Sequence, residues 1–165
     1  MDAVRIKLIV ADFYQDIARD LVTGAKAAVQ NYQATNPSLT IAGVDTATVP
    51  GALEIPAAIR FAIEEAKKTR QDYGYVALGC VIRGETSHYD IVAHESAHGL
   101  QILALNHFVA IGNGILTVET MEQAKIRANP HKISDTGKGA VGDKGGFAAL
   151  ACLRMLELKR QAGLL

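Results

Sequence analysis

Short apolar runs alternate along the chain with segments whose apolar residues recur every three to four positions. The runs are rich in Val, Ile and Leu with few polar interruptions, which is typical of strands buried on both faces of a parallel sheet. They predict strands at 5–11, 39–44, 75–82 and 108–116. The periodic segments each present an apolar face and predict helices at 15–32, 56–68, 87–106, 119–128 and 144–161.

This alternation predicts a parallel sheet that helices cover on both faces. No internal repeat or linker divides the chain, so we expect residues 1–165 to form one domain. In open sheets of this class, ligands bind beyond the carboxyl ends of the strands. The four predicted ends carry polar, glycine or aromatic residues, so one crevice could collect them all: 12–13, 49–54, 81–88 and 113–117.

Composition narrows the class of protein. Hydrophobic residues make up 49% of the 165 positions and charged residues 21%, as in globular proteins that fold in water. Seventeen basic and seventeen acidic side chains cancel, which argues against nucleic-acid or membrane-surface binding through bulk charge. No apolar segment approaches a membrane span, and the N-terminal run is too short for a signal sequence. We therefore expect a cytoplasmic protein, with Cys80 and Cys152 as buried small side chains rather than a disulfide.

The most informative stretch is 75–90, YVALGCVIRGETSHYD. Its apolar run breaks at Gly84, and Ser87 then offers a helix N-cap with Asp90 three positions on, a loose capping box. Strand, glycine turn and helix start bring backbone N–H groups together, which favours binding of an anion. His88 adds a group that can carry a proton near neutral pH. The simpler interpretation is a turn that only connects two core elements.

The segment His94-Glu95-Ser96-Ala97-His98 matches H-E-x-x-H, the zinc-binding helix of metalloproteases. A zinc hydrolase also needs a third ligand and an open coordination position. The residues that follow lack the glycine and histidine of the longer metalloprotease motif, and Glu119 is a conceivable third ligand. The alternative is a pair of surface histidines one turn apart on an amphipathic helix.

Five further residues suit a binding site, although each also has a purely structural interpretation. Glu54 can accept hydrogen bonds from a ligand or simply stabilise a helix start. Phe13 can stack on a planar ligand or belong to the core. Arg127 can clamp a phosphate or balance a helix C-terminus. Lys138 and Lys144 can bind an anion or remain solvated loop charges.

Three blocks together closely resemble the 6,7-dimethyl-8-ribityllumazine synthases: VPGALEIP (49–56), ALGCVIRGETSHYD (77–90) and GNGILTVETMEQAKIRA (112–128). The resemblance implies a flavodoxin-like three-layer α/β/α sandwich with a four-stranded parallel sheet. It implies the penultimate step of riboflavin biosynthesis, in which 5-amino-6-(D-ribitylamino)uracil condenses with 3,4-dihydroxy-2-butanone 4-phosphate. Phosphate and water are released, and no cofactor takes part. A non-catalytic flavin- or lumazine-binding protein on the same scaffold is the alternative.

The resemblance also implies roles for matching positions. His88 looks like the family's proton-transferring histidine, Phe13 like the aromatic residue that stacks on the pyrimidine, and Asn113 like a ring contact on the fourth strand. The segments that border the pyrimidine and the ribityl chain are matched by Ala52, Leu53, Glu54, Cys80, Val81 and Ile82. The family's phosphate-binding positions correspond to Gly84, Glu85, Thr86, Arg127 and Lys144.

Members of this family share each active site between neighbouring subunits. The resemblance divides the site into Phe13, Glu54 and His88 on one chain, and Asn113, Arg127 and Lys144 on the next. Asn113 stands where many members carry an aromatic residue, and the loop 129–142 is longer than the turn that joins pentamers in capsid-forming members. We therefore hypothesise a homopentamer or decamer rather than a sixty-subunit shell, with small-molecule substrates and no nucleic-acid or membrane partner.

Overall fold

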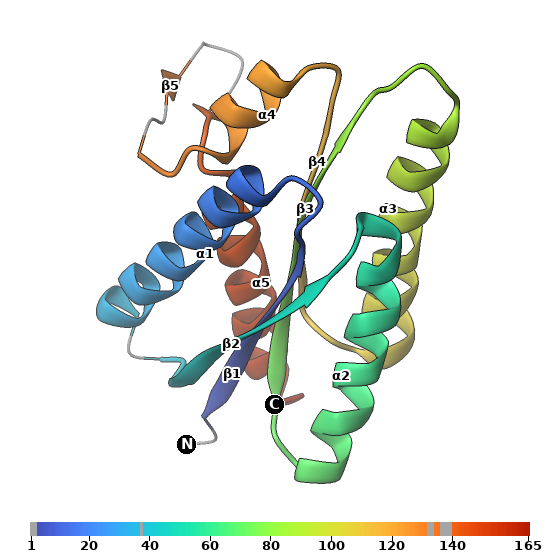
Figure 1. The fold of residues 1–165 in the computed structure, drawn as a ribbon. Helices are drawn as coiled ribbons and strands as arrows, with labels where there is room; N and C mark the ends of the chain where they lie inside the picture. Colours follow the sequence, from blue (N-terminus) through green and yellow to red (C-terminus); the bar gives the residue numbers. More distant parts are fainter. Residues whose placement is uncertain (1–2, 37, 132–133, 136–139) are drawn as a thin grey trace.

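The computed structural model describes residues 3–36, 38–131, 134–135 and 140–165. One sheet is formed by β1 (Val4–Ala11), β2 (Ile41–Val49), β3 (Tyr73–Ile82) and β4 (Ile111–Val118). The helices are α1 (Gln15–Thr35), the short 3₁₀ helix η1 (Ala52–Glu54), α2 (Ile55–Thr69), α3 (His88–His107), α4 (Met121–Ala128) and α5 (Lys144–Gln161) (Figure 1). Strands and helices alternate as the apolar pattern predicts.

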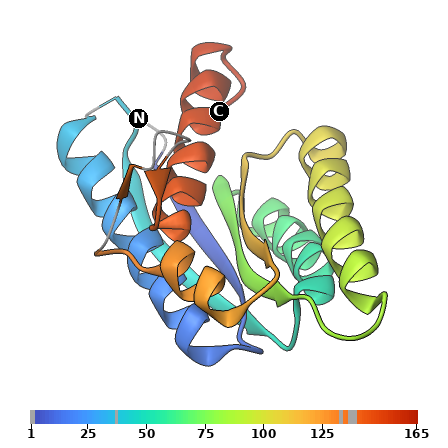
Figure 2. The same ribbon diagram turned by 90° about the horizontal axis from the view of Figure 1, so that it is seen from above.

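The sheet has the strand order β2-β1-β3-β4, and each neighbouring pair runs parallel. Helices α1, α4 and α5 cover one face, and α2 and α3 cover the other, which gives the three layers seen in Figure 2. The chain steps outward from β1 to β2 and then crosses back to β3 on the other side of β1. The predicted architecture, a parallel four-stranded sheet flanked by helices, is confirmed.

Burial explains why the central strands are so apolar. In β3 all residues between the two end positions are buried, because helices cover both faces. Strand β2 contains no buried residue, since it lies at an edge of the sheet. The apolar side chains form two cores, one between the sheet and α1, α4 and α5, and the other between the sheet and η1, α2 and α3.

Helix α5 approaches both β4 and α1 at backbone contact distance. A Cβ atom on Gly112 of β4 would overlap the carbonyl oxygen of Ala148 in α5 and would lie 2.8 Å from the carbonyl carbon. A Cβ atom on Gly145 of α5 would overlap the carbonyl oxygen of Leu21 in α1. Glycine at these two positions therefore allows α5 to pack closely against both β4 and α1.

Two strands differ from their predicted bounds by three or more residues at one end. The second was expected at 39–44, but β2 continues to Val49 because its pairing with β1 continues that far. The side chains of residues 45–49 are partly or largely accessible, so no apolar run marks this second half of the strand in the sequence. The fourth was expected to begin at Phe108, but that residue has a left-handed backbone (φ 53°) at the end of α3, and β4 begins at Ile111.

The segment between α4 and α5, expected to be one polar loop, contains a short antiparallel pair, β5 (Ser134–Asp135) and β6 (Ala140–Val141). The candidate anion ligand Lys138 lies outside the described residues, as does part of the loop 129–142 on which the assembly hypothesis depends. In the described parts of the chain, no helix has the length and apolarity that crossing a membrane requires.

Candidate active site

A pocket of about 460 Å³ opens beyond the carboxyl ends of β1, β2 and β3. It lies at the point where the strand order reverses, which is where open α/β sheets bind ligands, and its volume is typical of small-molecule sites. Ten of the fourteen predicted site residues line it, so strand ends far apart in sequence do come together. The lining of this switch-point pocket comprises Phe13, Tyr14, Gly51, Ala52, Leu53, Glu54, Cys80, Val81, Ile82, Gly84, Thr86, His88, Tyr89 and Val92.

Phe13 and Tyr14 form an aromatic wall where β1 leads into α1. The Phe13 side chain is 73% exposed, and its ring meets the Tyr14 ring edge to face with 5.0 Å between centroids. The prediction that Phe13 could be a core residue is therefore wrong. Exposure of so large an apolar ring is unfavourable, and a planar ligand stacked on it would remove that ring from water.

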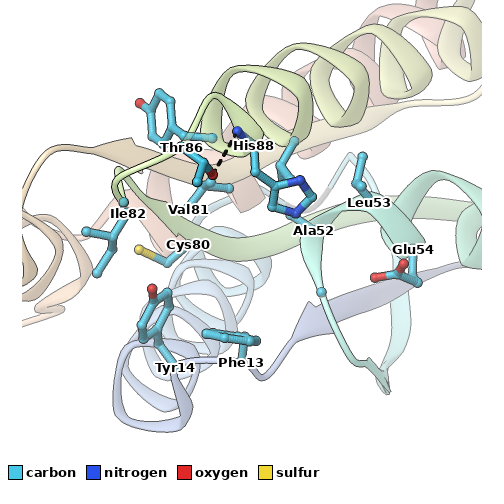
Figure 3. Close-up of a pocket in the computed structure, with 14 residues that line it drawn as sticks. Phe13, Tyr14, Ala52, Leu53, Glu54, Cys80, Val81, Ile82, Thr86 and His88 are labelled. Atoms are coloured by element: carbon cyan, nitrogen blue, oxygen red, sulfur yellow. Dashed lines mark hydrogen bonds between the residues drawn. The ribbon is translucent and has the colours of Figure 1, made fainter.

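The turn after β2 brings a carboxylate to another side of the pocket. Ala52 is buried, and η1 leads directly into α2, which has Pro56 in its first turn. Glu54 is exposed, and its side chain makes no cap hydrogen bond to α2. Its oxygens can therefore accept hydrogen bonds from the N–H groups of a ligand, and Figure 3 shows Glu54 and Leu53 beside the pocket, on the same side.

The end of β3 provides an apolar floor. Cys80 and Val81 are each 9% exposed, and Ile82 is partly buried. Burial raises the pKa of the Cys80 thiol to about 11. The thiol therefore stays neutral at neutral pH and is a weak nucleophile. The floor can contact an apolar ring or chain without reacting with it.

The polar rim of the pocket is the turn between β3 and α3. The capping box predicted for this turn is wrong. Ser87 is the N-cap residue, but its side chain makes no cap hydrogen bond. Thr86 Oγ instead accepts a hydrogen bond of 3.4 Å from the backbone N–H of His88. Asp90, the expected capping acid, pairs with Arg83. The first-turn N–H groups and the dipole of this 20-residue helix favour an anion at the rim.

The pocket combines several chemical capacities in one space (Figure 3). Phe13 offers a stacking surface, Glu54 offers hydrogen-bond acceptors, and the start of α3 offers backbone donors. His88, the first residue of α3, is exposed at the rim and can transfer a proton near neutral pH. Such a site can hold a planar, nitrogen-containing ring beside a phosphate ester.

Four predicted residues do not line the switch-point pocket. Glu85 is exposed on the turn before α3. Asn113, Arg127 and Lys144 line a second hollow of about 330 Å³ between β4, α4 and the start of α5, here called the β4 hollow. The expectation that one crevice of a single chain collects all four strand ends is therefore wrong. The reason is that β4 lies at the far edge of the sheet, beyond β3.

The β4 hollow has a cationic lining. Arg127 donates a hydrogen bond to the backbone carbonyl of Gln123 at 3.1 Å, which holds its guanidinium beside α4. Lys144 Nζ lies 4.9 Å from the centroid of the Phe147 ring. The described residues that line the hollow include two cations and no acid. The hollow therefore suits an anion, although it is separate from the switch-point pocket of its own chain.

The H-E-x-x-H motif lies on α3 with His94, Glu95 and His98 all exposed, and the only described contact among them joins His98 Nδ1 to Glu95 Oε2 at 4.0 Å. The conceivable third ligand, Glu119, accepts hydrogen bonds from Arg83. Across the residues that the structure describes, no group of three or more His, Cys, Asp or Glu side chains could hold a metal ion. The geometry supports the surface-histidine interpretation.

Sequence reasoning missed several residues at this site. Val92 lines the pocket four positions after His88, so the helical period from that residue was the signal that could have identified it. Tyr89 follows His88 directly, and helical spacing does not place such neighbours on the same face. No local pattern gives Arg83 a role at the site. Its guanidinium carbon lies 4.0 Å from the centroid of the Tyr89 ring.

Comparison with known proteins places this chain in a family. Residues 3–160 match the family model described as 6,7-dimethyl-8-ribityllumazine synthase. The chain is 50% identical over 161 residues to 6,7-dimethyl-8-ribityllumazine synthase 1 of Rhizobium meliloti (strain 1021), which covers 97% of this chain and 94% of that protein. It is 48% identical over 164 residues to the 6,7-dimethyl-8-ribityllumazine synthase of Agrobacterium fabrum (strain C58), with 99% of both chains covered. A third relative, from Bartonella tribocorum, is 49% identical over 158 residues, which cover 96% of this chain and 91% of the relative.

Proposed function

The chain belongs to the 6,7-dimethyl-8-ribityllumazine synthase family and is an enzyme of riboflavin biosynthesis, and we propose that the switch-point pocket is its catalytic centre. One observation carries this proposal. Ten residues to which the family resemblance gives a role, from three strand ends and the helix starts beside them, line a single pocket of suitable size.

In the proposed reaction, 5-amino-6-(D-ribitylamino)uracil condenses with 3,4-dihydroxy-2-butanone 4-phosphate, and phosphate and water are released. Phe13 stacks on the pyrimidine, and Glu54 accepts hydrogen bonds from the N–H groups of the uracil substrate. Imine formation between an aryl amine and a ketone requires proton transfer near neutrality, which His88 provides. The two substrates are held side by side, and this proximity supplies much of the acceleration.

The phosphate ester requires a cradle of N–H donors and positive charge. The turn of Gly84, Glu85 and Thr86 and the start of α3 provide backbone donors. Positive charge stabilises phosphate as it leaves, and the residues matched to that role are Arg127 and Lys144. Both line the β4 hollow of their own chain, so the switch-point pocket of one chain lacks them.

Each catalytic centre is therefore completed by the β4 hollow of a neighbouring subunit, which brings Asn113, Arg127 and Lys144. Members of this family are typically oligomers. Large apolar side chains on α4 and α5 near the hollow support a subunit contact there, since Ile126 is 52% exposed and Phe147 is 42% exposed. We expect a pentamer or a pair of pentamers. Light scattering tests this assembly, and a particle of megadalton mass would contradict it.

The enzyme assay mixes the two purified substrates with the purified protein and follows the absorbance of the lumazine chromophore. The expected result is product formation well above the uncatalysed condensation, in proportion to protein concentration. A rate equal to that of the uncatalysed reaction would overturn the proposed catalytic centre.

Replacement of His88 by alanine is expected to lower kcat by roughly tenfold, less than the usual loss of a general acid–base, because substrate proximity remains and water can carry protons. Steady-state kinetics measure the change. His94→Ala is the matched control, since His94 is an exposed histidine farther along α3 that does not line the switch-point pocket. Equal kcat values for the two variants would remove the role assigned to His88.

A further inference from the structure

Arg83 lies between β3 and the turn at Gly84, and its side chain joins two other segments. Its Nη1 and Nη2 donate hydrogen bonds to the two carboxylate oxygens of Asp90 at 3.3 and 3.1 Å, and its Nε donates to Glu119 Oε2 at 3.0 Å. The guanidinium also covers the Tyr89 ring, 4.0 Å from its centroid. Tyr89 and Asp90 belong to the first turn of α3, and Glu119 belongs to the connection from β4 to α4.

Hydrogen bonds also fix the backbone of Arg83 and of its partner Glu119. The backbone N–H of Arg83 donates to the carbonyl of Val118 at 3.0 Å, which attaches the residue to the end of β4. The backbone N–H of Glu119 donates to the side chain of Gln123 at 2.9 Å, and Thr120 caps α4 by accepting from the Gln123 N–H. Glu119, one partner of Arg83, is therefore fixed between the end of β4 and the capped start of α4.

The turn that follows Arg83 has little packing of its own. Residues 84–88 are all exposed, and a Cβ atom on Gly84 would meet no atom within 4 Å. Ser87 makes no cap hydrogen bond, and the contact between Thr86 and the His88 N–H is long at 3.4 Å. The position of this turn therefore depends on how the first turn of α3 is held.

Arginine suits this bridging role because its planar guanidinium can pair with two carboxylates and stack on an aromatic ring at the same time. The Arg83 side chain is 38% exposed, and both carboxylates are more than half exposed. Exposed ion pairs contribute little to the stability of a fold. Orientation is therefore the effect that this geometry supports.

We propose that Arg83 is a positioning residue for the reaction, which holds the anion-binding turn and His88 in place by joining the first turn of α3 to the start of α4. This inference rests on the proposed function, because the turn and His88 belong to the proposed catalytic centre. A displacement of about 1 Å at such a site can reduce catalysis by roughly a hundredfold.

The test measures kcat, both KM values and hydrogen exchange of residues 84–90 in the assembled enzyme. Arg83→Ala is expected to lower kcat/KM by at least about tenfold and to speed amide exchange in the turn, with a small change in Tm. Arg83→Lys keeps the positive charge but lacks the planar guanidinium that can pair with two carboxylates. Its kcat/KM should therefore lie between those of Arg83→Ala and the wild type. Asp90→Asn combined with Glu119→Gln should reproduce Arg83→Ala, because it weakens both ends of the same bridge.

Arg19→Ala is the matched control, since Arg19 forms an exposed ion pair with Asp16 at 2.8 Å on α1 and does not line the switch-point pocket. An Arg83→Ala enzyme with the kcat/KM and exchange rates of Arg19→Ala would overturn the positioning role, even if its Tm fell. If Arg83→Ala does not fold, Arg83→Lys and Glu119→Gln decide by the same comparison. An inactive wild-type enzyme would instead overturn the proposed function itself.

Discussion

Arg127→Ala is expected to raise the KM for the phosphate-bearing substrate by about 10- to 150-fold while the KM for the uracil substrate changes little. The variant removes charge-assisted hydrogen bonds to the phosphate, which contribute about 1.5–3 kcal/mol when their partner is a charged group. Initial rates at varied concentrations of each substrate measure both constants.

Two companion variants show whether the effect belongs to the guanidinium. Arg127→Lys keeps a cation but loses the two-pronged geometry, so we expect an intermediate KM. Lys125→Ala removes a nearby exposed cation from α4 that does not line the β4 hollow, and its kinetics should match those of the wild type. A phosphate-substrate KM for Arg127→Ala equal to that of Lys125→Ala would remove Arg127 from the site.

The same variant tests whether neighbouring subunits share the site. Phe13→Ala and Arg127→Ala damage opposite parts of the proposed centre, and each should be impaired by itself. If a neighbour supplies Arg127, oligomers assembled from both variants contain some centres in which both residues are intact, and activity should exceed the mean of the separate variants. Mixed oligomers that show only that mean would contradict a shared site.

Gly112→Ala is expected to lower the free energy of unfolding by at least about 3 kcal/mol, at the upper end of the usual cost of overpacking. The added methyl group would overlap the carbonyl oxygen of Ala148 in α5. Backbone atoms in a helix cannot rotate away as a flexible side chain can, so the whole of α5 would have to move off β4. Urea denaturation followed by circular dichroism gives the free energy.

Gly84→Ala is the control for this effect, because a Cβ atom on Gly84 would meet no atom within 4 Å. Its free energy of unfolding should stay within about 1 kcal/mol of the wild-type value. If Gly112→Ala were equally harmless, the close approach of α5 to β4 would not be a requirement of the fold.

The accuracy of the strand predictions followed the burial of each strand. Strand β3 is covered on both faces, so an unbroken apolar run marks it, and the prediction 75–82 missed only its first two residues. Strand β2 lies at an edge with accessible side chains, so the run at 39–44 indicated its start but not its continuation to Val49. Helix α5 begins at Lys144 as predicted, and the Asp143 side chain caps it by accepting a hydrogen bond from the Gly146 N–H.

The candidate site was predictable where its residues are neighbours in sequence or occupy corresponding strand ends. The turn at Gly84, the helix start at His88 and the aromatic Phe13 all follow from local patterns, and the structure gathers them in one pocket. The capping box at Ser87 was wrong because Asp90 has a stronger partner in Arg83, whose guanidinium donates to both of its oxygens. Local patterns cannot show such competition between partners.

The amino-acid sequence by itself determined the class of fold, the family and most of the residues that line the switch-point pocket, because apolar periodicity and short motifs depend on neighbours along the chain. The tertiary structure alone decided two further features. It put Arg127 and Lys144 in a hollow apart from His88, since β4 occupies the far edge of the sheet. It also joined Arg83 to Glu119, 36 positions away, because the ends of β3 and β4 are adjacent only once the sheet has formed.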